Sequence, residues 1–300
     1  MSYRVKRIFL FVFVIGFLSA GCSQNKTDVA CDDCNQQNML QQTIDKQNQW
    51  KTLNREVVTY YGQSNFDKAT ELGKKALQYA EQSFPKDHPY TATSLNNLAE
   101  VYRVKGDYRS AEPLYKKALK IREKVLGKDH IDVGLTLNNI AALYYQKSKF
   151  DLAEKNYLQS LKILENKLGD NSPQLEATLI NLAELYKQQR AYQNAEKFLK
   201  RVLFIQDKSK GQENPLYAKT INDLATVYFL QGKYSESEPL FKETLSILET
   251  SLGKDNPEIV VVLENIAEVY KKLGEEQKAE EFTQRANNIR LSNQPNVKGV

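Results

Sequence analysis

The sequence has 300 residues, of which 41% are hydrophobic and 26% are charged, a balance typical of a folded chain. Its 42 basic and 37 acidic residues give a formal net charge of +5, which falls to about +2 if Arg4, Lys6 and Arg7 are removed with an N-terminal leader. This is not the basic excess of nucleic-acid-binding proteins, so we expect no nucleic-acid partner.

The first 21 residues have the pattern of a secretory signal. Three basic residues precede an apolar run from Ile8 to Ala20. The run is shorter than the roughly 20 residues that a membrane-spanning helix needs, and its length is typical of the apolar region of a signal peptide.

The segment Leu18-Ser19-Ala20-Gly21-Cys22 resembles the lipobox of bacterial lipoproteins, although that family prefers leucine where Ser19 stands. The resemblance implies that residues 1–21 are removed and that Cys22 is acylated. The residue after the cysteine is Ser23, and by the family's sorting tendency this implies that the protein is carried to the outer membrane, where it faces the periplasm, in a cell that has an outer membrane. An ordinary cleaved signal and an uncleaved anchor are the alternatives.

Residues 22–42 are rich in Gln, Asn and Asp, which predicts a solvated tether. The tether contains Cys31 and Cys34, too few thiols for a four-cysteine zinc site. We interpret them as a small local disulfide of an oxidising compartment, with a thiol-redox role as the alternative.

An eight-residue pattern returns every 42 residues. Its five copies have alanine in the fifth place and tyrosine in the eighth, and they read LNNLAEVY from Leu95, LNNIAALY from Leu137, LINLAELY from Leu179, INDLATVY from Ile221 and LENIAEVY from Leu263. Apolar residues three and four apart predict an amphipathic helix in each copy. A fixed period of this size indicates a solenoid, whose units bury their apolar faces against their neighbours.

A second amphipathic pattern follows each copy and completes a pair of helices. It begins at Tyr108 in its clearest copy, and its counterparts begin at Phe66, Phe150, Tyr192, Tyr234 and Glu276. Proline is tolerated in the first turn of a helix, which predicts helix starts at His88-Pro89, Ser172-Pro173, Asn214-Pro215 and Asn256-Pro257. Since His88 and His130 both fall at this position, we interpret them as cap or turn residues rather than as a metal or catalytic pair.

These features resemble the tetratricopeptide repeat, in the 42-residue form of kinesin light chains and many bacterial proteins. The LNNLAEVY-type helix, the helix that starts at Tyr108 and the Gly-Lys-Asp-His/Asn-Pro joint carry the resemblance. It implies an all-α superhelical solenoid of about six helix pairs over residues 43–290. The first copy has Val57 in place of alanine and, together with Trp50, looks like a terminal cap. Residues 291–300 are expected to form a disordered tail.

In this family the first helix of each pair lines a concave groove, and an asparagine two residues before the small residue often bonds to the backbone of a bound peptide. The matching positions here are Asn97, Asn139, Asn181, Asp223 and Asn265. An amide offers one donor and one acceptor group to any peptide bond, so the resemblance implies a protein or peptide ligand. The alternative is that these amides brace neighbouring helices.

Outward positions on the same helices alternate between charged and aromatic residues. Arg103, Lys187 and Lys271 each follow a glutamate at helical spacing, whereas Tyr145 and Phe229 follow a small residue. We expect the basic residues to place charges at intervals along the groove. We expect the two aromatic residues to contact apolar side chains of the ligand. In the alternative interpretation, each aromatic ring packs on its neighbouring helix.

The sequence has no glycine-rich phosphate loop, no HExxH or GxSxG motif and no acidic cluster with metal-ligand spacing. We therefore expect no catalysis, cofactor, metal site or small-molecule substrate. The predicted function is a lipid-anchored scaffold or adaptor that binds a protein or peptide in the bacterial cell envelope. The alternatives are an assembly or pilot lipoprotein that binds a folded subunit of an outer-membrane or pilus machine, and, less favoured, a thiol-redox envelope factor.

Overall fold

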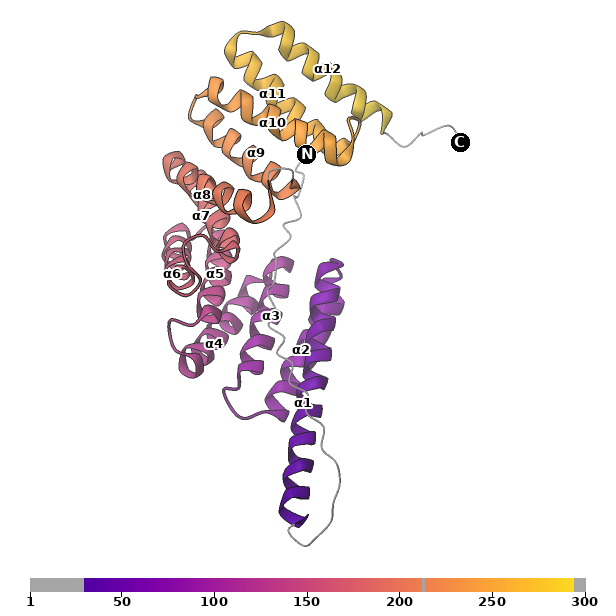
Figure 1. Ribbon diagram of the computed structural model, residues 1–300, viewed down its shortest axis with the longest axis vertical. Coiled ribbons are helices and arrows are strands. Elements are labelled where there is room, and N and C mark those ends of the chain that lie inside the picture. The colour runs from indigo at the N-terminus through magenta and orange to yellow at the C-terminus, as the bar shows by residue number, and fades with distance from the viewer. Residues whose placement is uncertain (1–29, 212–213, 294–300) are drawn as a thin grey trace, which may run out of the picture. The chain divides into compact units, whose positions relative to one another are not determined.

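The computed structural model describes residues 30–211 and 214–293, with side chains from residue 37 onward except that of Lys210. Twelve α-helices and two short 3₁₀ turns, η1 and η2, account for nearly all of these residues (Figure 1). In chain order they are α1 Ala30–Gly62, α2 Phe66–Ser83, α3 Pro89–Lys105, α4 Tyr108–Leu126, α5 Ile131–Gln146, α6 Phe150–Leu168, η1 Pro173–Leu175, α7 Glu176–Gln188, α8 Tyr192–Lys210, α9 Pro215–Leu230, α10 Tyr234–Leu252, η2 Pro257–Ile259, α11 Val260–Leu273 and α12 Glu276–Ser292.

Odd-numbered helices are the first members of the predicted pairs and even-numbered helices are the second members. The all-α solenoid expected from the repeats is therefore confirmed. Contacts divide the chain into an N-terminal unit up to Asn156 and a C-terminal unit from Tyr157, with the boundary inside α6.

Local signals define where the helices begin and end. His88 caps α3 and His130 caps α5, because each ring Nδ1 accepts a hydrogen bond from the backbone N–H two residues on, at 3.1 Å. The interpretation of both histidines as cap residues is therefore confirmed. At the other end of α3, Gly106 adopts the left-handed conformation with φ of 83°, which a residue without a Cβ reaches at low cost.

The alanine of the repeat lies where neighbouring helices approach each other. In all five copies its side chain is at most 3% exposed: Ala99, Ala141, Ala183, Ala225 and Ala267. A larger side chain would hold the helices apart, so this small residue permits the packing that the repeat needs.

In the N-terminal unit, α1 to α5 pack each against the next along the chain. The expected cap is present: Trp50 is 5% exposed, its ring stacks on Tyr90 at 4.0 Å between centroids, and its Nε1 donates a hydrogen bond to Ser94 Oγ at 2.8 Å. Trp50 thus closes the first pair against α3.

The first helix begins earlier than expected. It starts at Ala30, inside the predicted tether, and its N-terminal half projects beyond α2 and α3 (Figure 1). Met39 and Leu40 on this half are 68% and 61% exposed. The polar composition that predicted a tether has no apolar period, which explains why the sequence did not indicate a helix there.

In the C-terminal unit, α7 to α12 pack in the same sequential way. The last two pairs share one hydrophobic cluster, to which α9 contributes Ala225 and α11 contributes Val262 and Ile266. The predicted tail lies outside the described residues except for Leu291 and Ser292, which belong to α12, and Asn293. None of the described helices is long and apolar enough to cross a membrane.

Candidate peptide-binding face

A chain of amide side chains crosses the first helices of the N-terminal unit. Asn139 Nδ2 on α5 donates to Asn96 Oδ1 on α3 at 3.1 Å, and Asn97 Nδ2 on α3 donates to Asn54 Oδ1 on α1 at 2.8 Å. Within α3, Asn96 Nδ2 lies 3.4 Å from Asn97 Oδ1, which joins the two bonds. We call these four residues the amide chain.

The amide chain contains Asn97 and Asn139, two of the positions expected to bind a peptide. Asn97 is 9% exposed, and both its oxygen and its nitrogen already have partners. Asn181, the next expected position, is 5% exposed. In the N-terminal unit the geometry agrees with the alternative interpretation, in which these amides brace neighbouring helices.

Arg103 is expected on the surface of the groove, but its side chain is buried inside the N-terminal unit. The Arg103 guanidinium donates to both carboxylate oxygens of Glu100, and both residues are 3% exposed. Tyr115 OH on α4 and Tyr61 OH on α1 also donate to Glu100, at 2.5 Å and 2.9 Å. The carboxylate therefore joins three helices inside the N-terminal unit instead of facing a ligand.

The electrostatics of Glu100 follow from these contacts. Burial alone would raise the pKa of Glu100, but the Arg103 charge and the bonds from Arg103, Tyr115 and Tyr61 outweigh burial and hold the pKa below its usual value. Burial and the Glu100 charge together raise the pKa of Tyr61 and of Tyr115. Both phenols thus remain protonated hydrogen-bond donors to Glu100.

The counterparts of Glu100 and Arg103 in the last helix pair have a different environment. Glu268 and Lys271 stand four repeats after Glu100 and Arg103, but their side chains are 46% and 51% exposed and 3.9 Å apart. Phe229 and Thr283 stand where the first pairs have Tyr61 and Tyr115. Since neither of them has a phenolic hydroxyl, the carboxylate is left at the surface.

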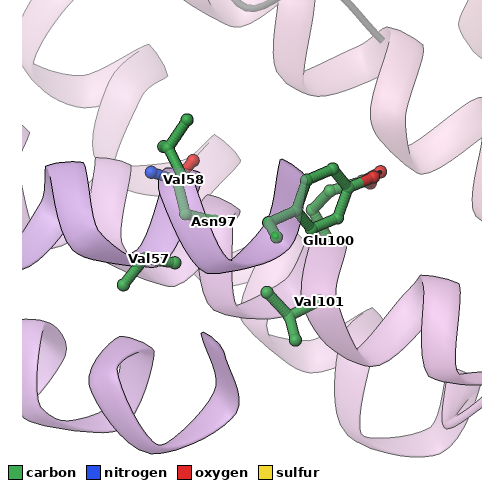
Figure 2. A pocket seen from close by; sticks show the side chains of 6 residues that line it. Val57, Val58, Asn97, Glu100 and Val101 are labelled. Atoms are coloured by element: carbon green, nitrogen blue, oxygen red, sulfur yellow. Dashed lines mark hydrogen bonds between the residues drawn. The ribbon is translucent and has the colours of Figure 1, made fainter. Parts of the chain in front are cut away.

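A small pocket lies between α1 and α3, with Glu100 of this buried cluster in its wall (Figure 2). Its walls are valine side chains, one tyrosine ring and two residues of the buried hydrogen-bond networks: Val57, Val58, Tyr61, Asn97, Glu100 and Val101. Because Asn97 and Glu100 already have hydrogen-bond partners inside the protein, the pocket offers a ligand mainly apolar contact.

The two predicted aromatic anchors each pack on the following helix. The ring of Tyr145 lies 5.8 Å from that of Phe150 on α6, and the ring of Phe229 lies 5.2 Å from that of Tyr234 on α10. Phe229 also packs against the hydrophobic cluster of the C-terminal unit. Both rings are half-buried, so each has an intramolecular packing role whatever it offers a ligand.

The remaining predicted positions lie in the C-terminal unit. Lys187 pairs with Glu184 at 2.7 Å, and both side chains are 23% exposed. Asp223 and Asn265 are partly buried, and Lys271 is exposed. Lys271 on α11 is therefore the most exposed of the predicted positions.

A repeated contact that the sequence interpretation missed joins successive pairs. The tyrosine that ends the eight-residue pattern donates its hydroxyl to a glutamate 32 residues earlier: Tyr144 to Glu112 at 3.3 Å, Tyr228 to Glu196 at 3.2 Å and Tyr270 to Glu238 at 2.6 Å. Hydrogen bonds from Lys116 and Lys147 hold the pKa of Glu112 at about 2. The recurrence of glutamate in the Ala-Glu and Ser-Glu dipeptides of the second helix was the signal available in the sequence.

Within the described residues, no group of three or more His, Cys, Asp or Glu side chains is arranged to hold a metal ion. Cys22 lies outside the described residues. Cys31 and Cys34 lie on α1, but their side chains are not among those described, so their predicted disulfide stays a prediction.

Comparison with known protein families identifies tetratricopeptide repeats at residues 51–124, 90–166, 132–208 and 216–292. No curated protein matches the chain. Among solved structures, BtubC (BKLC) from P. vanneervenii is 24% identical, with a TM-score of 0.64 over 83% of this chain and 96% of that one.

Two further solved structures share the fold. A putative kinesin light chain from Podosopora anserina is 22% identical, with a TM-score of 0.58 over 68% of this chain and 97% of that one. Pseudomonas aeruginosa pilF is 14% identical, with a TM-score of 0.56 over 83% and 99%. At these identities the likeness concerns the fold. The paired helices, the 42-residue period and the family matches place this chain in the tetratricopeptide repeat family.

Proposed function

We propose that this protein is a lipid-anchored, non-catalytic scaffold that binds a protein or peptide partner in the bacterial cell envelope. The observation that carries the proposal is the tetratricopeptide solenoid itself, whose repeats match from residue 51 to residue 292. Such repeats present an extended surface built from successive helices, and that surface suits protein binding better than small-molecule chemistry.

The anchoring part of the proposal rests on the N-terminal sequence. The basic residues, the apolar run to Ala20 and the small residues before Cys22 have the order of a lipoprotein signal. A lipid on Cys22 would hold the solenoid at a membrane, and Ser23 favours the outer membrane facing the periplasm in a diderm cell.

The anchor is tested by mass spectrometry of the protein extracted from membranes. We expect a mature chain that begins at Cys22 and carries acyl mass, and a Cys22→Ser variant that is recovered from the soluble fraction. A mature N-terminus elsewhere, or a Cys22 without acyl groups, would refute lipid anchoring while leaving protein binding open.

The binding role is tested by crosslinking in the native membrane, followed by identification of the attached protein. A photoreactive residue on the first-helix face should give one reproducible adduct. The same residue on the second-helix face should not. Absence of any adduct from either face would contradict a scaffold role.

A second candidate, an assembly or pilot lipoprotein that binds a folded subunit, is favoured by one feature of the second helices. Phe204 on α8 is 50% exposed, and an aromatic ring at the surface can serve as an anchor in a protein–protein interface. Phe204→Ser should abolish the adduct if a folded subunit covers this face. It should have no effect if the first helices bind the partner.

A further inference from the structure

Four basic side chains form a line along the outer face of α4. Successive members stand eight, three and four residues apart, spacings that keep residues on one side of a helix, and all four are exposed: Arg109, Lys117, Lys120 and Lys124. From Arg109 to Lys124 the line is about 22 Å long, at about 1.5 Å per residue. We call these four residues the basic stripe.

The repeat does not require these charges. At the corresponding places, none of the other five second helices has more than two basic residues. In α10 there is none, because these places hold Ser235, Glu243, Ser246 and Thr250. The basic stripe is therefore a feature of α4 and not of the fold, which indicates a role beyond packing.

Internal ion pairs neutralise the basic stripe only in part. Lys117 pairs with Glu81 of α2 at 2.8 Å, and both side chains are about half exposed. Arg109 and Lys120 form no ion pair with any residue that the structure describes. Since an exposed pair contributes little to stability, an external anion can compete with Glu81 for Lys117.

Basic residues outnumber acidic ones at the C-terminal end of the stripe. Lys124 binds Asp87 at 2.5 Å, and this bond, together with the charges of Lys86 and Lys120, holds the pKa of the Asp87 carboxyl below its usual value. One carboxylate thus faces three cations.

The N-terminal end of the stripe borders an open hollow of about 440 Å³. Arg109 lies in its wall, next to Lys116 and Lys147, which share the carboxylate of Glu112. Three cations again face one carboxylate, so an excess of positive charge extends along the whole stripe.

The composition of the stripe fits the headgroups of a membrane better than a protein surface. Interfaces between proteins are enriched in aromatic residues and depleted of lysine. Here three of four members are lysine, and the aromatic residues of α4, Tyr108 and Tyr115, are partly or fully buried. Lysine is a point charge on a flexible stem, which suits phosphate groups that have no fixed arrangement.

The length of the N-terminal segment keeps α4 close to the proposed anchor. Eight residues lead from Cys22 to Ala30, where α1 begins, and they span at most about 28 Å. Because α1 to α5 pack each against the next, a lipid on Cys22 would hold the whole N-terminal unit near the same membrane.

We propose that the basic stripe of α4 binds the phosphate groups of anionic phospholipids, so that the second-helix side of the N-terminal unit lies on the membrane. This inference rests on the proposed lipid anchor and adds which side of the unit meets the bilayer. The first-helix face of the unit then stays open to a partner.

Vesicle sedimentation tests the stripe without the anchor. The chain from residue 22 onward, made with Cys22→Ser so that it carries no lipid, is titrated with vesicles of phosphatidylcholine alone or of equal parts of phosphatidylcholine and phosphatidylglycerol. We expect binding to the anionic vesicles only, and weaker binding as salt is added, because the Debye length is about 8 Å at physiological ionic strength. Equal binding to both vesicles, or no binding to the anionic ones, would overturn the proposal.

Single variants locate the binding on the stripe. Arg109→Gln and Lys120→Gln should each weaken binding to the anionic vesicles about fivefold, the change expected for one cation at an anionic surface. Neither variant breaks an ion pair within the described chain, so both should fold. Lys120→Arg keeps the charge and should bind as the original chain does.

Lys162→Gln is the matched control. Lys162 is exposed on α6, one period of 42 residues after Lys120, but Gln159 and Asn166 stand beside it where α4 has Lys117 and Lys124. We expect the affinity for anionic vesicles to stay unchanged. Equal losses in Lys120→Gln and Lys162→Gln would show that net charge alone is responsible and would refute the stripe.

A photoreactive residue in place of Pro113 tests the lipidated chain in its native membrane. Pro113 is exposed between Arg109 and Lys117 on α4. Irradiation should attach a phospholipid at this position. A protein adduct would make the stripe a protein-binding surface and would overturn the proposal.

Failure of this inference can be told apart from failure of the proposed function. An acylated Cys22 without vesicle binding by the stripe would keep the anchor and refute the inference. A Cys22 without acyl groups, together with vesicle binding that weakens in Lys120→Gln, would refute the anchor and support the stripe.

Discussion

Arg103 Nη2 lies 2.5 Å from Glu100 Oε1, and Arg103 Nε lies 2.8 Å from Glu100 Oε2, in an ion pair that is almost fully enclosed. A sequence pattern typical of an exposed helical salt bridge therefore forms a buried junction here. The reason lies in the neighbouring helices, since the phenols of Tyr61 and Tyr115 cover the carboxylate from two sides.

Removal of one partner of this pair should be strongly destabilising. Arg103→Met leaves the Glu100 carboxylate buried without its counter-ion, and we expect a loss of about 3–5 kcal/mol in the free energy of unfolding. Urea unfolding followed by circular dichroism measures it. The double variant Glu100→Gln/Arg103→Met should recover much of the loss, because no charge then remains buried and the amide oxygen can still accept from the phenols of Tyr61 and Tyr115.

Lys271→Met is the matched control, because the Glu268–Lys271 pair is about half exposed and screened by water. We expect it to change the free energy of unfolding by less than about 1 kcal/mol. Equal effects of Arg103→Met and Lys271→Met would contradict the burial of the first pair.

The bond between Tyr270 and Glu238 should contribute measurably to the packing of α11 on the preceding pair. Tyr270 is 1% exposed and its hydroxyl lies 2.6 Å from Glu238 Oε1. Tyr270→Phe removes only that hydroxyl, and we expect a loss of about 1–2 kcal/mol in chemical denaturation.

Tyr102 occupies the same place in its repeat, but its hydroxyl has no hydrogen-bond partner among the described residues, and position 70, where the later pairs have glutamate, is Thr70. Tyr102→Phe should therefore change stability by less than about 0.5 kcal/mol. A loss as large as that of Tyr270→Phe would show that the tyrosine–glutamate bond is not the cause.

Acid should weaken the start of α3 through His88. The neutral ring accepts a bond from the Tyr90 backbone N–H and stacks on Phe84 at 4.7 Å between centroids, and burial lowers the pKa of His88 in the folded chain. Since the unfolded pKa is about 6.5, the contribution is complete above that pH and is lost as the pH falls through the lower folded pKa.

The measurement is the thermal midpoint of the N-terminal unit between pH 7.5 and pH 5. Asparagine caps α9 at the same position through Asn214, so His88→Asn should keep the cap without titrating. The part of the pH dependence that disappears in His88→Asn is assigned to this ring. If the variant retains the whole slope, the acid sensitivity arises elsewhere.

Phe229 should behave as a packing residue in addition to any role on the surface. Its ring contacts Tyr234 and the cluster formed by the last two pairs, so Phe229→Ala should cost about 2 kcal/mol in the free energy of unfolding. Phe204→Ala, which truncates a ring that is 50% exposed, should cost less than about 1 kcal/mol. A negligible effect of Phe229→Ala would restore the sequence-based view of this ring as a ligand anchor.

The fold could be predicted because one small residue and one tyrosine return at a fixed interval. Ala99 and its counterparts are buried as expected, and Pro89 and Pro215 begin helices. At Pro173 and Pro257 the first turn is a 3₁₀ turn, a local difference that capping residues do not reveal.

The site was harder to predict because residues of the neighbouring repeat decide whether each candidate residue is exposed or buried. Glu100 and Glu268 have nearly the same local sequence, but only Glu100 has phenols within reach. Similarly, Asn97 is occupied because Asn54 lies opposite it on α1. The sequence of a single helix does not contain these partners. A comparison of each repeat with the repeat before it in the chain would have indicated them.

The two interhelical bonds of the amide chain each join residues 43 positions apart, one more than the period. The α3–α4 pair therefore presents Asn97 to the pair before it and Asn96 to the pair after it. A pair can be exchanged only for one that matches on both sides, and α7 has Ile180 where α3 and α9 have asparagine. A copy of α7–α8 inserted between α3–α4 and α5–α6 would therefore leave Asn139 without its acceptor while preserving the period, whereas a copy of α3–α4 in the same place would keep an asparagine at both positions.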